Sequence, residues 1–181
     1  MKIVIASDIH GSAYFCELLM NAIKEEKPDK IIFLGDILYH GPRNDLPKDY
    51  APKKVIEMLN PLKDKILSVR GNCEAEVDQM VLEFSVLEDY KTFEFGDKKA
   101  VLTHGHLGDD RLPDMKDFDI LLNGHTHIPK CEEKENYIFM NPGSVSIPKE
   151  NSPHSYMVFE DNEFLWKNLE SGEVYSKYAM K

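Results

Sequence analysis

Short apolar runs alternate with longer amphipathic stretches in the first third of the chain. Three runs, at residues 2–7, 30–34 and 65–69, are rich in isoleucine, valine and leucine and have the length of buried strands. The apolar residues between the first two runs recur at helical spacing behind Ser12, a candidate N-cap, and a shorter helix is expected at residues 53–60. The order β-α-β-α-β predicts a parallel sheet with right-handed, helical crossovers.

After residue 85 the pattern becomes that of a β-rich region. Residues 91–95 and 99–103 flank a Gly-Asp turn and predict an antiparallel hairpin, and residues 119–123 predict a buried strand. Further strands are expected at residues 137–140, 155–160 and 163–168. The chain therefore has the pattern of an α/β (α+β) fold with two packed sheets and helices outside, without a visible domain boundary.

Composition excludes several function classes. The chain has 181 residues and a net charge of −10, which argues against binding of the nucleic-acid backbone through a broad basic surface. Bound cations would offset part of this charge. No apolar run approaches the length of a membrane span, and the first apolar run is strand-like and too short for a signal peptide, so we expect none. Three cysteines without framework spacing favour a reducing cytoplasm.

Five polar islands interrupt the hydrophobic pattern: SDIHG, GDILYHG, GNCE, THGH and GHTH. All except THGH follow an apolar stretch that is predicted above as a strand, and THGH follows the apolar AVL of the hairpin. They contain seven residues of metal-ligand type, which are Asp8, His10, Asp36, Asn72, His104, His125 and His127. Each alone has an ordinary explanation as a helix cap, a turn residue or a surface histidine. Together, at the ends of strands, they predict a metal site.

The types of ligand indicate the kind of site. Asp8 and His10 are two residues apart and point to the same side of the chain, while Asp36 has two oxygens that could bridge two ions. A mixed nitrogen and oxygen set suits Mn, Fe, Zn, Co or Ni better than Ca or Mg. Seven ligands exceed one tetrahedral site and suit two ions about 3.5–4 Å apart, with open positions for water and substrate. This points to metal-activated water attacking a phosphate ester.

The islands resemble those of the calcineurin-like metallophosphoesterase family, whose motifs D-x-H, G-D, G-N-[H/D/C], H and G-H-x-H occur here in the same order from residue 3 to about residue 147. The segments GDILYHGPRN, VRGNCEAEVDQM and NPGSVSIP are similar to its YfcE-like phosphodiesterase branch. The resemblance implies one domain over residues 1–181 with the metallophosphoesterase fold, a two-sheet β-sandwich flanked by helices. It also implies a first metal held by Asp8, His10, Asp36 and His127, and a second held by Asp36, Asn72, His104 and His125.

In such an enzyme two divalent transition metal ions would activate a bridging hydroxide that attacks phosphorus in line. Manganese is the ion the resemblance favours, with Ni, Co, Fe and Zn as alternatives. Side chains then mainly position groups and stabilise charge. The residues expected to take part in catalysis are Asp36, Asn72, Cys73 and His106. The expected substrate is a small phosphodiester, and a homodimer or homotetramer is plausible by resemblance.

Cys73 departs from the wider family, in which a histidine often follows the strand-end asparagine. A thiol has a reference pKa of about 8.5 and carries no positive charge when protonated, so it replaces an imidazolium poorly. This favours diesters with a good leaving group over monoesters. Alternatively, Cys73 is a small filler beside the metals.

Other residues near the islands are weaker candidates. His40 and Arg43 follow Asp36, and both are candidates for binding substrate. Arg43 could pair with a phosphate oxygen or simply with loop carboxylates. His106 could orient a ligand or contact substrate. Residues 141–144 (NPGS) follow a strand and either bring backbone groups near the site or form a plain turn.

Two other functions compete with a phosphodiesterase. A metal-dependent phosphomonoesterase is disfavoured by Cys73. An interaction scaffold similar to the retromer subunit of this fold would be expected to lose ligands, whereas this chain has all seven.

Overall fold

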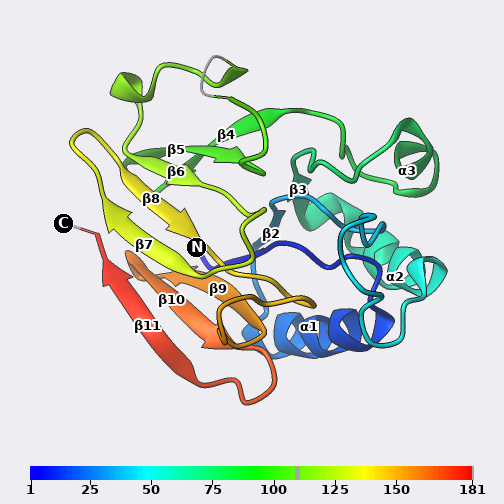
Figure 1. Cartoon of the computed structure of the whole chain (residues 1–181). Coiled ribbons are helices and arrows are strands. Elements are labelled where there is room, and N and C mark those ends of the chain that lie inside the picture. Colours follow the sequence, from blue (N-terminus) through cyan, green and yellow to red (C-terminus); the bar gives the residue numbers. More distant parts are fainter. Residues whose placement is uncertain (109–110, 181) are drawn as a thin grey trace.

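The computed structural model describes residues 1–108 and 111–180, which form two mixed sheets packed against each other, with helices against the outer face of one (Figure 1). The six-stranded sheet has the order β11-β10-β9-β1-β2-β3 and the five-stranded sheet the order β4-β5-β6-β8-β7. This confirms the predicted fold class. The shared core of the two sheets supports the expectation of one domain, which stays a prediction.

In the six-stranded sheet, β1 (Ile3–Ala6), β2 (Lys30–Phe33) and β3 (Ile66–Ser68) are parallel. The antiparallel strands β9 (Ser155–Glu160), β10 (Glu163–Asn168) and β11 (Val174–Ala179) continue the sheet from β1. The crossovers between the parallel strands contain α1 (Ala13–Glu26), α2 (Pro52–Leu59) and the 3-10 helix η1 (Asn60–Lys65). The predicted β-α-β-α-β order is confirmed.

In the five-stranded sheet, β5 (Lys98–Thr103), β6 (Ile120–Leu122) and β8 (Ile138–Asn141) are parallel, and β4 (Tyr90–Phe95) and β7 (Lys130–Glu133) pair antiparallel at the two edges. Two short helices, α3 (Glu76–Val81) and η3 (Met115–Asp117), lie in the connections. The β4–β5 hairpin is confirmed.

Burial on both faces of β1 and β2 explains their continuous apolar sequence. Val4 and Ile31 pack with α1 and α2, whereas Ile3, Ile5 and Ile32 face the second sheet. A strand that is buried on both faces needs apolar residues at every position. The parallel strands are therefore held firmly between two hydrophobic layers, and this fixes the positions of the polar residues that follow them.

Ser12 begins α1 as expected, because its Oγ accepts a hydrogen bond from the amide of Phe15. None of the described helices is long and apolar enough to cross a membrane.

Candidate metal centre

The seven candidate ligands meet where the carboxyl ends of strands from both sheets come together. Two follow β1, and one each follows β2, β3 and β5, while the last two follow β6: they are Asp8 and His10, Asp36, Asn72, His104, and His125 and His127. Sites of α/β proteins lie outside the carboxyl ends of parallel strands, because all the following loops begin there. Here two sheets contribute loops to the same place.

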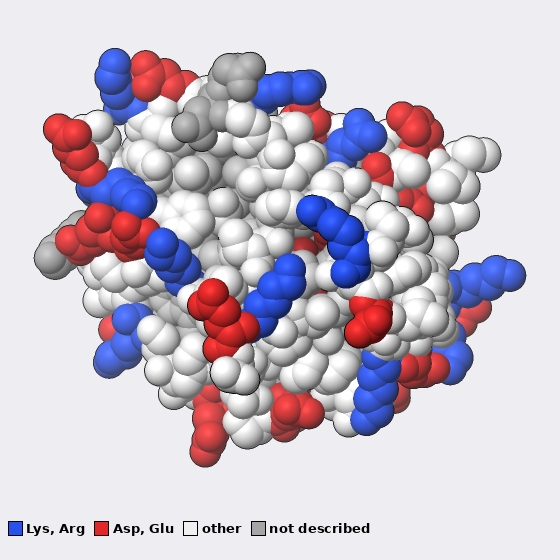
Figure 2. Space-filling model, viewed as in Figure 1, with Lys and Arg blue, Asp and Glu red and all other residues white. Residues whose placement is uncertain are grey.

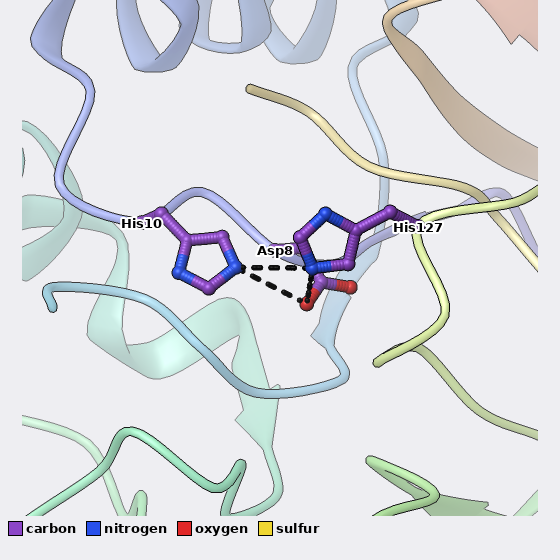
Figure 3. Close-up of side chains that lie close together, drawn as sticks. All are labelled: Asp8, His10 and His127. Carbon is purple, nitrogen blue, oxygen red and sulfur yellow. Dashed lines mark hydrogen bonds and ion pairs between the residues drawn. The ribbon is translucent and has the colours of Figure 1, made fainter. Parts of the chain in front are cut away.

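Asp8, His10 and His127 form the first cluster of donor atoms. The Nε2 atom of His127 lies 3.2 Å from Oδ1 of Asp8, and the Nε2 atoms of His10 and His127 are 3.2 Å apart. Nε2 of His10 is also 3.5 Å from the same aspartate oxygen. Figure 3 shows both rings turned so that a nitrogen points at Asp8. These atoms could hold one cation.

Asp36 joins this cluster to a second one. Its Oδ2 atom lies 3.7 Å from Nε2 of His10 and 3.4 Å from Nε2 of His104. The same nitrogen of His104 is 3.1 Å from Oδ1 of Asn72 and 3.3 Å from Nδ1 of His125. The carboxylate of Asp36 therefore lies between two groups of nitrogen and oxygen donors.

In three of the histidines, a hydrogen bond at Nδ1 determines which ring nitrogen is free to bind a cation. Nδ1 of His10, His104 and His127 donates a hydrogen bond to a backbone carbonyl, at 2.8, 2.6 and 2.6 Å respectively. Because a carbonyl can only accept, the single proton of a neutral ring sits on Nδ1, and Nε2, which faces the cluster, is the nitrogen that can bind a cation. Such a bond is typical of metal-bound histidine. Oδ1 of Asp8 is also buried and receives no hydrogen bond from any described residue. The donor set therefore fits divalent metal ions.

The backbone bends sharply at five of the seven residues. Asp8, His10, Asp36, His125 and His127 all have positive φ, between 49° and 65°. A residue other than glycine in this region costs about 1–3 kcal/mol, and such residues gather at functional sites. Hydrogen bonds from surrounding backbone hold the bends, such as the amide of His10 donating to the carbonyl of Asp36 at 2.9 Å.

Buried charges shift the pKa values of the cluster. Burial would raise the pKa of Asp8, but the imidazoles of His10 and His127 beside its carboxylate outweigh burial and hold that pKa below its usual range. Burial likewise would lower the pKa of His104, whereas the neighbouring Asp36, with Asp8, raises it to about 9. Without bound cations, His104 therefore supplies a positive charge beside the two carboxylates.

One residue of the site, Glu74, was not singled out in the sequence, whereas the NPGS segment was. Glu74 lies in the GNCE island, is only 4% exposed, and accepts three backbone hydrogen bonds. Burial and the charge of Asp36 raise its pKa to about 7. The NPGS segment is more than a plain turn, because Oγ of Ser144 donates to the carbonyl of Asp8 at 2.9 Å and Nδ2 of Asn141 donates to the carbonyl of Gly124 at 2.7 Å. A glutamate in a polar island gives no sign of burial in the sequence.

The weaker candidates fall in different places. A cavity of about 440 Å³ opens over the clusters and is lined by Asp36, Arg43, Asn44, Asn72, His125, Thr126, His127 and Lys149. Arg43 thus faces the site, together with Lys149. The His40 ring instead packs edge-on against Tyr39 and Tyr50, with centroids 4.7 and 5.1 Å away.

Cys73 and His106 are adjacent to the clusters. The Cys73 sulfur lies within 4.8 Å of ligand atoms of His10 and Asp36, and its amide donates to Oδ1 of Asp36 at 2.9 Å. Burial, followed by the Asp36 charge, raises the pKa of this thiol, which is therefore protonated at neutral pH. The His106 ring lies 5.4 Å from that of His104 between centroids, and burial lowers the pKa of His106.

Comparison with known proteins places this geometry in a family. Residues 1–163 match the model of the calcineurin-like phosphoesterase superfamily domain. Phosphodiesterase YfcE of Escherichia coli (strain K12) is 45% identical over 166 residues, which cover 91% of this chain and 90% of that protein. The solved structure of YfcE, described as a phosphoesterase, superposes with a TM-score of 0.93 at 40% identity over the whole of both chains.

A more distant neighbour shares the fold only. Vps29 of Entamoeba histolytica, solved in complex with zinc, has a TM-score of 0.67 at 21% identity, over 98% of each chain.

The raised pKa of His104 predicts how pH changes the stability of the metal-free protein. Because the pKa of about 9 lies above the unfolded value of 6.5, this stabilisation is complete below pH 6.5 and is lost as pH rises through 9. We expect the free energy of unfolding to fall by roughly 3 kcal/mol over this window, measured by urea unfolding with a chelator present. The fall should be smaller in His104→Asn.

Saturating manganese should abolish the fall, since ligation requires a neutral imidazole. A metal-free protein that grows more stable over this range would contradict the assignment.

Proposed function

The chain belongs to the calcineurin-like phosphoesterase superfamily, and from this premise we propose that it is a metal-dependent phosphodiesterase that hydrolyses small phosphodiesters. The observation that carries the proposal is the pair of donor clusters that share Asp36 under an open cavity. The 45% identity to a phosphodiesterase over most of both chains supports the same reaction.

We assign the ligands as two overlapping sets. Asp8, His10, Asp36 and His127 would hold one ion, and Asp36, Asn72, His104 and His125 the other, as their facing atoms suggest. When bound, two such ions supply a nucleophilic water of lowered pKa and offset the charge of the phosphate. The mixed donors favour manganese, with Ni, Co, Fe and Zn as alternatives.

The chain's own residues orient the phosphate. Arg43 and Lys149 line the cavity and form no ion pair with any described residue, so both are free to bind phosphate oxygens. We propose that His106, whose pKa is lowered, contacts substrate or a ligand as a neutral imidazole. His40 stays a candidate for binding substrate, although its ring packs against two tyrosines.

Cys73 directs the preference towards diesters. A thiol whose pKa is raised by burial and by Asp36 is a weak proton donor and offers no positive charge. A phosphomonoester carries up to two negative charges and gains from a cationic neighbour, whereas a diester carries one. An aryl leaving group also departs with little help from an acid.

Small substrates suit the charge of the surface. Acidic and basic side chains are interspersed over the face in Figure 2, and the residues described there form no broad basic area. This fits a small diester better than a long nucleic acid. A homodimer or homotetramer stays a prediction.

The first test removes the shared carboxylate. Asp36→Asn should lower kcat/KM for bis(p-nitrophenyl) phosphate by at least about 100-fold, because even changes outside the metal ligands cost 10–100-fold. Elemental analysis should show less bound metal. Asp45→Asn, an exposed change in the same loop, is the control. If Asp36→Asn keeps most of the rate, Asp36 does not bridge.

The second test concerns the preference for diesters. The wild type should cleave bis(p-nitrophenyl) phosphate faster than p-nitrophenyl phosphate, and Cys73→His should shift the ratio of kcat/KM values towards the monoester. Both are measured in saturating manganese, with the exposed Cys131→His as control. A wild type that prefers the monoester would overturn this interpretation of Cys73, and an unchanged ratio in Cys73→His would leave Cys73 a packing residue.

The third test concerns Arg43. Arg43→Ala should raise KM for the aryl diester by about tenfold, the loss of one charge-assisted hydrogen bond, without changing the metal content. Arg111→Ala removes an exposed arginine that pairs with Asp89 and serves as the control. An unchanged KM would show that Arg43 does not bind the phosphate.

A further inference from the structure

Glu74 is buried between the ends of β2 and β3, where it acts as an acceptor for backbone amides. Its Oε2 atom accepts hydrogen bonds from the amides of Asp36 at 2.9 Å and Gly71 at 2.5 Å, and its Oε1 atom accepts one from Ile37 at 2.7 Å. No described lysine, arginine or histidine forms an ion pair with it. Three amides therefore satisfy a carboxylate that is only 4% exposed.

The backbone around Asp36 is shaped to hold this carboxylate. Gly35 has φ +90° and Asp36 has φ +54°, so the two successive amides of Asp36 and Ile37 point to the same side. Successive amides in such a bend form a concave site for an anion. In this protein the anion is the side chain of Glu74.

Close approach of two glycines makes room for the arrangement. A Cβ atom on Gly35 would lie 2.6 Å from the amide nitrogen of Gly71, and one on Gly71 would lie 2.6 Å from Oε2 of Glu74. Both contacts are too short for a Cβ atom. The loops after β2 and β3 therefore need glycine at both positions to approach each other beside the Glu74 carboxylate.

These two loops carry Asp36 and Asn72, which lie in the same proposed ligand set. The connection continues from Glu74, because the amide of the neighbouring Cys73 donates to Oδ1 of Asp36 at 2.9 Å. The Glu74 side chain thus holds the backbone of Asp36 and the backbone before Asn72, and the adjacent amide of Cys73 holds the Asp36 carboxylate.

Resting on the proposed function, we propose that Glu74 is a positioning residue that sets the shared carboxylate of Asp36 and the amide of Asn72 before any metal binds. It does not itself touch metal or substrate. Its loss should therefore weaken metal binding and loosen the bridge, while leaving the chemical step intact once metal is saturating.

Glu74→Gln is the most informative variant, since it keeps the shape and removes the carboxylate. A glutamine has one acceptor oxygen, and its NH₂ group would face at least one of the three amides as a second donor. Glu76→Gln is the matched control, because it removes the same charge two residues away at an exposed position.

The first measurement needs no metal and no activity. Hydrogen exchange by NMR in the metal-free protein should be at least about tenfold faster at the amides of Asp36, Ile37 and Gly71 in Glu74→Gln, the equivalent of one charge-assisted hydrogen bond. Glu76→Gln should match the wild type.

The second measurement titrates manganese by calorimetry and by activity. Affinity should fall by about 10–100-fold in Glu74→Gln, and kcat at saturating manganese should stay within a few-fold of wild type. At saturation, the electron paramagnetic resonance signal of the coupled manganese pair should change, because the geometry of the bridge is altered. A loss of negative charge alone would weaken affinity without changing that signal.

Several outcomes would overturn the proposal. These are unchanged exchange at the three amides, unchanged manganese affinity, an unchanged coupled signal, or a kcat that stays low at saturating manganese. If Glu74→Gln does not fold, Glu74→Asp takes its place: it keeps the charge but is one methylene shorter, and it should show intermediate affinity and faster exchange at one or more of the amides.

A wild type without diesterase activity would instead refute the proposed function. The exchange and metal-binding measurements would still decide the role of Glu74.

Discussion

Buried negative charge is the constraint on which the rest of this structure depends. Asp8, Asp36 and Glu74 are at most 4% exposed, and burial, together with the charge of Asp36, raises the pKa of Glu74. No lysine or arginine within the described ranges pairs with any of them. Their carboxylates instead contact imidazoles or accept hydrogen bonds from backbone amides. Carboxylates brought this close in a dry environment are costly unless cations complete the arrangement. Divalent ions would do so.

The packing of the two sheets and the site form one structural unit. The amide of His125 donates to Oδ2 of Asp8 at 3.1 Å, and the hydroxyls of Ser144 and Ser146 both donate to the carbonyl of Asp8. Loops of the second sheet therefore close over the end of β1. Such bonds help to hold five ligands in a left-handed conformation that an isolated segment would leave. Site geometry and global stability should consequently be hard to change separately.

The fold alone does not decide the function. Vps29 shares this architecture at 21% identity, whereas YfcE is 45% identical to this chain. Proteins that share a fold differ in function because they carry different side chains at the functional site. The scaffold alternative is disfavoured here because all seven donors converge and a cavity lies open above them.

Local sequence was enough for the features that depend on local patterns. Strands β1, β2 and β3 are visible as short apolar runs, and helix α1 is visible because its apolar residues recur at helical spacing. The edge strands β7 and β11 were missed, because they are largely exposed and carry charged residues without alternation. The parallel pairing of β5, β6 and β8 also has no local signal, since it joins segments far apart in the chain.

The candidate site likewise has features that the local sequence predicts and features that only the tertiary structure shows. The sequence alone supplied the seven donors, because aspartate, asparagine and histidine at strand ends are rare in combination. Only the tertiary structure showed that Asp36 lies between two clusters, that Arg43 faces the cavity while His40 does not line it, and that Glu74 is buried. The sequence does not show whether a polar side chain is solvated by water or buried against backbone amides. The tertiary structure determines which of these groups forms its hydrogen bonds.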